Sequence, residues 1–175
     1  MDSAAIMPVR TDAGMLCVWS PHAFGAVRDY DSWEEHVNDR LHDAIASGDL
    51  VPVNIESDGT WGVRLSPPGE GLSSRERTYE VVTSEPYLLV VSGGEALVSG
   101  IEGVGDVAGA PLRLRLGDGR YVVRTTLVAW DEEPGAIGTG GNPSDSALAD
   151  FVIQVDLEVG SGPYRIDEIT FEKPE

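Results

Sequence analysis

The sequence predicts a mainly β protein, either an antiparallel β-sandwich or a partly open barrel of about ten short strands, with one amphipathic α-helix. Three observations lead to this prediction. Short segments with apolar residues at every second position recur at spacings of roughly ten residues, as in sandwiches and barrels. Clusters of Gly, Pro, Asn, Asp and Ser separate these segments, as turns require. A single segment has its apolar residues at helical spacing.

The start of the chain contains little that predicts regular structure. Residues 1–14 are small, polar and proline-containing, and we expect a loose N-terminal lead-in there. Met15–Trp19 is a short apolar run before Ser20-Pro21, long enough for a first strand. With 175 residues, the chain lies within the usual size of one domain, so we expect residues 1–175 to form a single domain.

The helix is predicted between Ser32 and Ser47. Ser32 and Glu35 have the spacing of a capping box, in which each side chain accepts from a backbone N–H at the helix start. Apolar residues then recur at helical spacing, namely Trp33, Val37, Leu41, Ala44 and Ile45. Gly48 follows as the expected C-terminal cap.

The clearest strand pattern lies between Pro111 and Trp130. Three leucines alternate with two arginines over residues 112–116, and a second alternating run covers residues 121–129. Asp118-Gly119 lies between the two runs and suits a tight turn, because glycine adopts positive φ without steric cost. We therefore expect a β-hairpin with one solvated face.

Further strands are predicted from shorter patterns. Residues 50–55 and 60–65 should pair as a second hairpin across a Ser-Asp-Gly turn. The remaining candidate strands are residues 78–82, 87–91, 96–100, 151–159 and 164–171. Proline and glycine predict loops at residues 66–75 and 131–146. A loop as long as the second is uncommon inside a compact domain and is usually either functional or disordered.

The charge balance is the most unusual bulk property. The chain has 30 acidic and 12 basic residues, which gives a formal net charge of −18. A field of this sign repels nucleic acid and anionic lipid and speeds the encounter with a basic protein. We therefore expect no nucleic-acid partner and no membrane partner. Solubility alone, or adaptation to salt, would also account for the acidity.

The compartment expected from the sequence is the cytoplasm. The single cysteine, Cys17, excludes an internal disulfide and fits a reducing environment. No apolar run approaches the ~20 residues that a membrane-spanning helix needs. The N-terminal residues lack the cationic region and apolar core of a signal peptide.

No catalytic set, metal site or cofactor is predicted, and we expect a protein that is not an enzyme. Cys17 lies inside an apolar run, so a place in the core is expected rather than a nucleophilic role. His36 and His42 are six positions apart, about 120° out of phase on a helix, and do not suit one metal ion. The glycine-rich stretches lack the Lys-Ser/Thr pair of a phosphate loop. An enzyme whose carboxylates meet only in space stays open as a lesser alternative.

Two groups of residues are candidates for binding. The first is acidic and would contact a basic partner: Glu34, Glu35, Asp39 and Asp43 on the helix, with Asp131, Glu132 and Glu133 beside the long loop. The second is aromatic and would line a small-molecule or carbohydrate cleft under the loop at residues 131–146: Trp61, Trp130 and Tyr121. Aromatic residues at these places more often anchor a core. The acidic group is the leading hypothesis, because the net charge is −18 and the sequence contains no recognisable catalytic set.

Two short motifs give the sequence a resemblance to known proteins. Trp33-Glu34-Glu35-His36-Val37, Gly119-Arg120-Tyr121 and the overall acidity resemble small bacterial β-sandwich proteins of the competence nuclease-inhibitor type. In composition and layout the chain is also similar to immunity proteins that neutralise bacterial toxins. The resemblance implies a non-enzymatic inhibitor of a basic nuclease or toxin. Asn38-Asp39 stands where the inhibitor family continues into Gly-Phe, so no functional residue is carried over.

Overall fold

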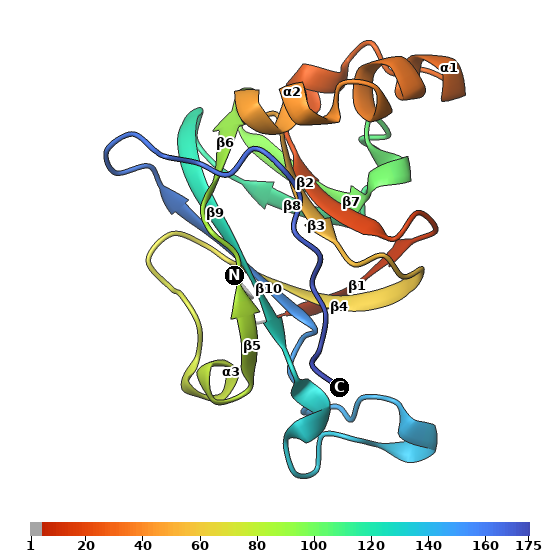
Figure 1. Cartoon of the computed structure of the whole chain (residues 1–175), viewed down its shortest axis with the longest axis vertical. Helices are drawn as coiled ribbons and strands as arrows, with labels where there is room; N and C mark the ends of the chain where they lie inside the picture. Colours follow the sequence, from red (N-terminus) through yellow and green to blue (C-terminus); the bar gives the residue numbers. More distant parts are fainter. Residues whose placement is uncertain (1–4) are drawn as a thin grey trace.

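Ten strands form two sheets in the computed structural model, which describes residues 5–175 (Figure 1). The larger sheet has the order β1 (Ile6–Thr11), β4 (Gly59–Ser66), β10 (Phe151–Leu157), β9 (Gly119–Val128) and β5 (Glu80–Thr83), and β6 (Tyr87–Val91) also pairs with β9. The smaller sheet has the order β3 (Leu50–Asn54), β2 (Met15–Trp19), β7 (Glu95–Gly100) and β8 (Leu112–Arg115). Neighbouring strands are antiparallel except β4 and β10. The predicted mainly β fold class is confirmed.

The predicted helix is present as three short pieces at one end of the molecule (Figure 1). They are α1 (Tyr30–Trp33), the π-helical turn η2 (Glu34–Asn38) and α2 (Leu41–Ser47). The helical path breaks at Arg40, whose φ of −117° and ψ of 23° lie outside the helical range. Gly48 ends α2 with a φ of 83°, which confirms the predicted cap.

Two details of the predicted helical regions are wrong. The capping box at the start of α1 joins Asp29 to Ser32 instead of Ser32 to Glu35, so the helix begins earlier than predicted. Within the loop predicted at residues 66–75, Ser73 and Glu76 form a second capping box and begin α3 (Ser74–Thr78). The 3-10 turns are η1 (Pro21–Phe24), η3 (Ile101–Gly103), η4 (Trp130–Glu132) and η5 (Thr139–Gly141).

Both predicted hairpins are wrong, because in each case the chain crosses from one sheet to the other. β8 pairs with β7 in the smaller sheet, whereas β9 lies in the larger one. Asp118 does not form a hairpin turn; its carboxylate accepts from the backbone N–H groups of Gly93 and Gly94, both at 2.8 Å. β3 and β4 are divided between the sheets in the same way. A two-layer fold buries the apolar side of each strand between the layers. Consecutive strands therefore have apolar residues at every second position even where they belong to different sheets and do not pair as a hairpin.

The two ends of the chain also differ from the prediction. Residues 6–11, expected in a loose lead-in, form β1 and pair with β4; residues 1–4 lie outside the described range. The strand predicted at residues 164–171 is absent, and one bridge joins Thr170 to Asn54. This segment instead covers the core, since Phe171 is buried against Phe151 at 5.6 Å between ring centroids.

The core lies between the sheets and under the helical pieces. Trp19, Tyr87 and Phe151 are among its largest fully buried side chains, and α2 packs on β3 and β6. Cys17 is fully buried, as predicted, and burial raises the pKa of its thiol. Within residues 5–175 the structure contains no helix with the length and apolar character needed to span a bilayer.

Candidate functional site

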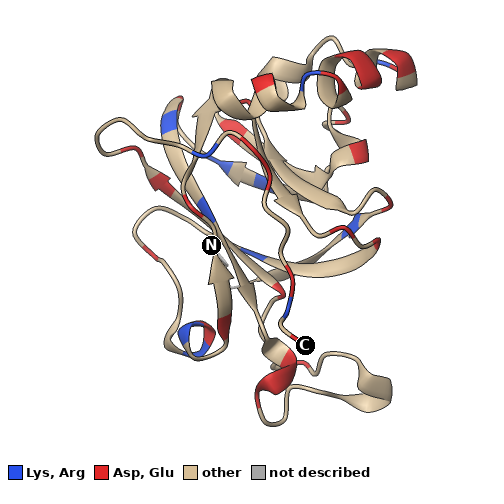
Figure 2. Ribbon diagram, in the orientation of Figure 1, with Lys and Arg blue, Asp and Glu red and all other residues tan. Residues whose placement is uncertain are grey.

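The predicted acidic residues lie at two opposite ends of the molecule (Figure 2). The helix acid group, Glu34, Glu35, Asp39 and Asp43, belongs to η2, the residue after it and α2. The loop acid group, Asp131, Glu132 and Glu133, belongs to η4 and the residue that follows it. The structure therefore does not bring the two groups together into one contact surface.

Basic side chains compensate much of the loop acid group. Asp131 lies 2.7 Å from Lys173 Nζ, and Glu133 accepts two hydrogen bonds from Arg75, at 2.6 and 2.8 Å. The hydrogen bond from Lys173 lowers the pKa of Asp131, and that from Arg75 lowers the pKa of Glu133. Both carboxylates are thus ionised and paired, so their effect on a distant partner is reduced.

The helix acid group is much less compensated. Among the described residues its single ion pair joins Glu35 to Arg40, at a distance of 4.0 Å and with both side chains mostly exposed. Asp39 and Asp43 are exposed, and Glu34 is half-buried. An exposed pair at this distance contributes little energy. The helical end therefore presents negative charge that the protein itself leaves free.

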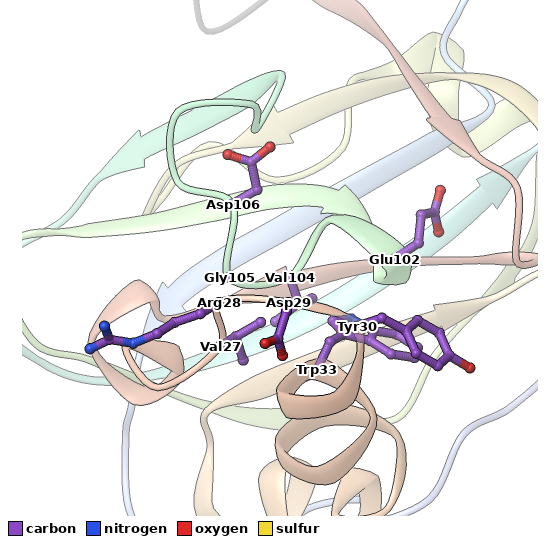
Figure 3. A pocket seen from close by; sticks show the side chains of 9 residues that line it. All are labelled: Val27, Arg28, Asp29, Tyr30, Trp33, Glu102, Val104, Gly105 and Asp106. Atoms are coloured by element: carbon purple, nitrogen blue, oxygen red, sulfur yellow. The ribbon is translucent and has the colours of Figure 1, made fainter.

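A cavity of about 500 Å³ opens beside α1 at this same end (Figure 3). One wall comes from the segment that enters α1, and the other comes from η3 and the turn after it. The lining residues are Val27, Arg28, Asp29, Tyr30, Trp33, Glu102, Val104, Gly105 and Asp106. Three carboxylates against one guanidinium make the charge of this lining negative.

Two aromatic rings form one side of the cavity. Tyr30 and Trp33 stack, with ring centroids 6.1 Å apart and an angle of 26° between the planes. The Tyr30 side chain is 69% exposed, which is unusual for so large an apolar surface. Trp33 Nε1 donates to the Ile101 carbonyl at 3.0 Å and so joins the two walls. Tyr30 is therefore accessible from solvent, whereas Trp33 is half-buried and packs against the core.

Each carboxylate of the cavity has a structural partner that fixes its position. Asp29 accepts from the Ser32 backbone N–H at 2.9 Å, and this hydrogen bond lowers the pKa of Asp29. Glu102 accepts from Thr11 Oγ1 at 3.0 Å and so holds the turn between β1 and β2. Asp106 accepts from the Gly109 N–H at 3.1 Å. The acidic lining is thus preorganised.

The predicted aromatic residues do not share a cleft. Trp130 Nε1 donates to Asp150 Oδ1 at 2.7 Å, and Asp150 Oδ2 accepts from the N–H of Gly62, beside Trp61. The two tryptophans therefore lie near the same end of the larger sheet. Tyr121 pairs with Leu157 at the opposite end of β9, and its hydroxyl donates to the Gly117 carbonyl.

The described residues contain no group of three or more His, Cys, Asp or Glu side chains placed to hold a metal ion. The carboxylates of the cavity are positioned by backbone and hydroxyl donors. What the arrangement offers chemically is a negatively charged, partly aromatic recess in a negatively charged surface.

No known protein family and no curated protein matches the sequence. Two solved structures match most of the chain. The fold is similar to that of ComJ. ComJ is described as the inhibitor of the DNA-degrading activity of NucA from Bacillus subtilis; the TM-score is 0.54 at 9% identity, covering 88% of this chain and 96% of ComJ. A second structure, described as crocagin biosynthetic gene J, matches with a TM-score of 0.55 at 17% identity, covering 89% of this chain and 96% of that one.

The match to ComJ confirms the predicted resemblance to the competence nuclease-inhibitor type at the level of the fold. The sequence does not predict the cavity, because its second wall comes from a glycine-rich segment whose composition indicates only a connector. One local signal is present: Asp29 and Ser32 have capping spacing, and Tyr30 and Trp33 lie three positions apart, which places them on one side of a helix.

Proposed function

We propose that this protein is a non-enzymatic inhibitor that binds a basic protein, either a nuclease or a bacterial toxin. The observation that carries the proposal is the uncompensated negative charge of the helical end, where the helix acid group and the acidic cavity lie together. The similarity to ComJ supports it, because a protein with this fold inhibits the DNA-degrading activity of NucA.

The charge gives the proposal a physical mechanism. A net charge of −18 produces a long-range field that attracts a basic protein, and the free carboxylates at the helical end set its orientation. The same field disfavours nucleic acid and anionic membranes as partners. The setting that we propose is the cytoplasm, where Cys17 would remain reduced.

The proposed contact surface consists of the helix acid group and the cavity beside α1. The loop acid group is left out of this surface, because it lies at the other end of the molecule and is largely paired. Partner binding at the helical end would bury Tyr30, whose exposure in the free protein is high.

The proposal predicts that charge reversal of the helix acid group slows association with the partner. The experiment captures proteins from a lysate of the native host at low salt, identifies them by mass, and then measures the activity of the purified partner with the inhibitor added. The variant carries Glu34→Lys, Glu35→Lys, Asp39→Lys and Asp43→Lys. We expect a basic partner whose activity falls on binding and whose association with the variant is at least ~10-fold slower, because electrostatic steering is lost.

A matched control reverses four exposed acidic residues elsewhere, namely Asp58, Glu132, Asp145 and Glu172. The control changes the net charge by the same amount and should leave most of the affinity in place. Equal losses in both variants would mean that binding follows net charge alone, without a defined surface. A captured partner whose activity is unchanged by binding would contradict the inhibitory role.

A further inference from the structure

The free edge of β8 has the properties of a binding site for an extended peptide. β8 is the last strand of the smaller sheet, and within residues 5–175 no strand pairs with its outer edge. The expected partner, β9, lies in the other sheet. An unpaired edge presents backbone N–H and C=O groups that can pair with a strand from another chain.

The register shows which backbone groups of β8 are available. Leu116 N–H donates to the Gly94 carbonyl at 3.1 Å, and Leu114 lies opposite Ala96. Hydrogen bonds in an antiparallel pair recur at every second residue, so the leucines of β8 bond to β7. The N–H and C=O groups of Arg113 and Arg115 therefore point to the free edge.

An apolar groove of about 350 Å³ lies along this edge. Leu112 and Leu114 of β8 line it together with Leu116, which follows the strand, while Met7 and Leu65 line it from the larger sheet. The leucines are half-buried, and Met7 is 39% exposed. Alternate apolar side chains of an added strand would enter this groove, because successive side chains of a strand point to opposite faces. The groove shares no lining residue with the acidic cavity.

The charges on β8 indicate which charged residues a peptide bound at this edge would carry. Arg113 and Arg115 are exposed on the face opposite to the leucines, and Arg113 pairs with Glu95 of the neighbouring strand at 3.1 Å. An incoming strand with acidic residues at every second position would repeat this pairing on the other side of β8. A second copy of β8 would place arginine opposite arginine, which is unfavourable.

We infer that the outer edge of β8 binds an extended peptide segment of another protein in which aliphatic and acidic residues alternate. The aliphatic side chains fill the groove, the acidic side chains pair with Arg113 and Arg115, and the peptide backbone extends the sheet. The inference is independent of the proposed inhibitory role, since it uses a different surface.

The test uses a synthetic, end-blocked peptide of the sequence Glu-Leu-Glu-Val-Glu-Leu-Glu and its lysine counterpart, Lys-Leu-Lys-Val-Lys-Leu-Lys. Fluorescence anisotropy measures binding to the full chain, and hydrogen exchange measures protection of individual backbone amides. We expect the glutamate peptide alone to bind and to slow exchange at Arg113 and Arg115, while Leu114 is already protected. Arg115→Glu should weaken binding by roughly three- to ten-fold.

Arg124→Glu is the matched control, because Arg124 is also exposed but lies on β9. This variant should bind the glutamate peptide as well as the wild type does. Equal binding of the lysine peptide, or unchanged exchange at Arg113 and Arg115 in the complex, overturns the inference. So does a dimer, detected by analytical ultracentrifugation, that occupies this edge in the absence of peptide.

Discussion

The ion pair between Arg64 and Glu76 is buried, with side chains 8% and 3% exposed. Arg64 Nε and Nη2 donate to the two carboxylate oxygens at 2.6 and 2.7 Å, and Nη1 donates to Glu70 at 2.9 Å. Glu76 also accepts from the Ser73 N–H at the start of α3. The pair thus joins α3 to β4, and each charge depends on the other because neither is accessible to water.

Replacing Glu76 by Gln should destabilise the fold by about 3 kcal/mol, because Arg64 would then lack its main counter-charge in a buried position. Urea unfolding at pH 7 measures the change. Glu85→Gln is the control: Glu85 is mostly exposed and pairs with Arg165 at 3.4 Å, so its loss should cost less than about 1 kcal/mol. Equal effects of the two substitutions would contradict the role assigned to the buried pair.

The pH dependence of the same variant gives a second readout. Burial opposes ionisation of Glu76, but the hydrogen bonds from Arg64 and Ser73 outweigh it, so the pKa of Glu76 is lowered in the folded state. The stability that the carboxylate contributes is therefore present above its unfolded pKa and is lost as the pH falls through the folded pKa. The difference between wild type and Glu76→Gln should narrow below about pH 4.

At the scale of elements, the sequence predicts strands better than it predicts their partners. Met15–Trp19 and Tyr87–Val91 have the predicted bounds, because apolar patterning depends only on the strand itself. Pairing depends on the path of the chain after the strand. Asp118-Gly119 has the composition of a hairpin turn. Yet the Asp118 carboxylate accepts hydrogen bonds from the backbone of Gly93 and Gly94, which form the turn before β7 and lie far from Asp118 in the sequence. The same limit applies to the cavity, because its two walls come from segments far apart in the sequence, such as those that carry Trp33 and Ile101.

The helix cap at Gly48 tests how tightly α2 is packed on the sheet. A Cβ added at Gly48 would lie 2.8 Å from the side chains of Leu88 and Val90, and the residue has a φ of +83°. Gly135 has the same φ but open space around it. We expect Gly135→Ala to cost about 1 kcal/mol from the backbone alone, and Gly48→Ala to cost about 1–3 kcal/mol more from overpacking. Urea unfolding measures the free energy of unfolding of both variants. Equal losses would mean that α2 shifts away from β6 at little energetic cost.

At the scale of the whole molecule, the folded state holds a net charge of −18 that is unevenly distributed. Arg75 and Lys173 compensate acidic residues at the end that carries η4, whereas few basic residues compensate those at the helical end. A surface arranged for solubility alone would gain nothing from this asymmetry. A surface arranged to attract one partner in one orientation would gain from it, and this supports the proposal that the free charge serves binding.

The excess of acidic residues makes the folded protein repel itself, so its thermal stability should depend on the salt concentration. Raising NaCl from about 10 mM to about 300 mM shortens the screening length from roughly 30 Å to less than 10 Å, so the melting temperature should rise by several degrees.

At low salt, the reversal variant of the helix acid group should melt higher than the variant with Asp58, Glu132, Asp145 and Glu172 reversed, although both change the net charge equally. The reason is that the four residues of the helix acid group lie within one short helical segment and repel one another, whereas the four control residues lie on separate segments of the chain. Differential scanning calorimetry across the salt series measures both effects. Equal melting temperatures for the two variants would show that the repulsion is uniform over the surface, and the functional role of the helical end would then depend on the partner experiment alone.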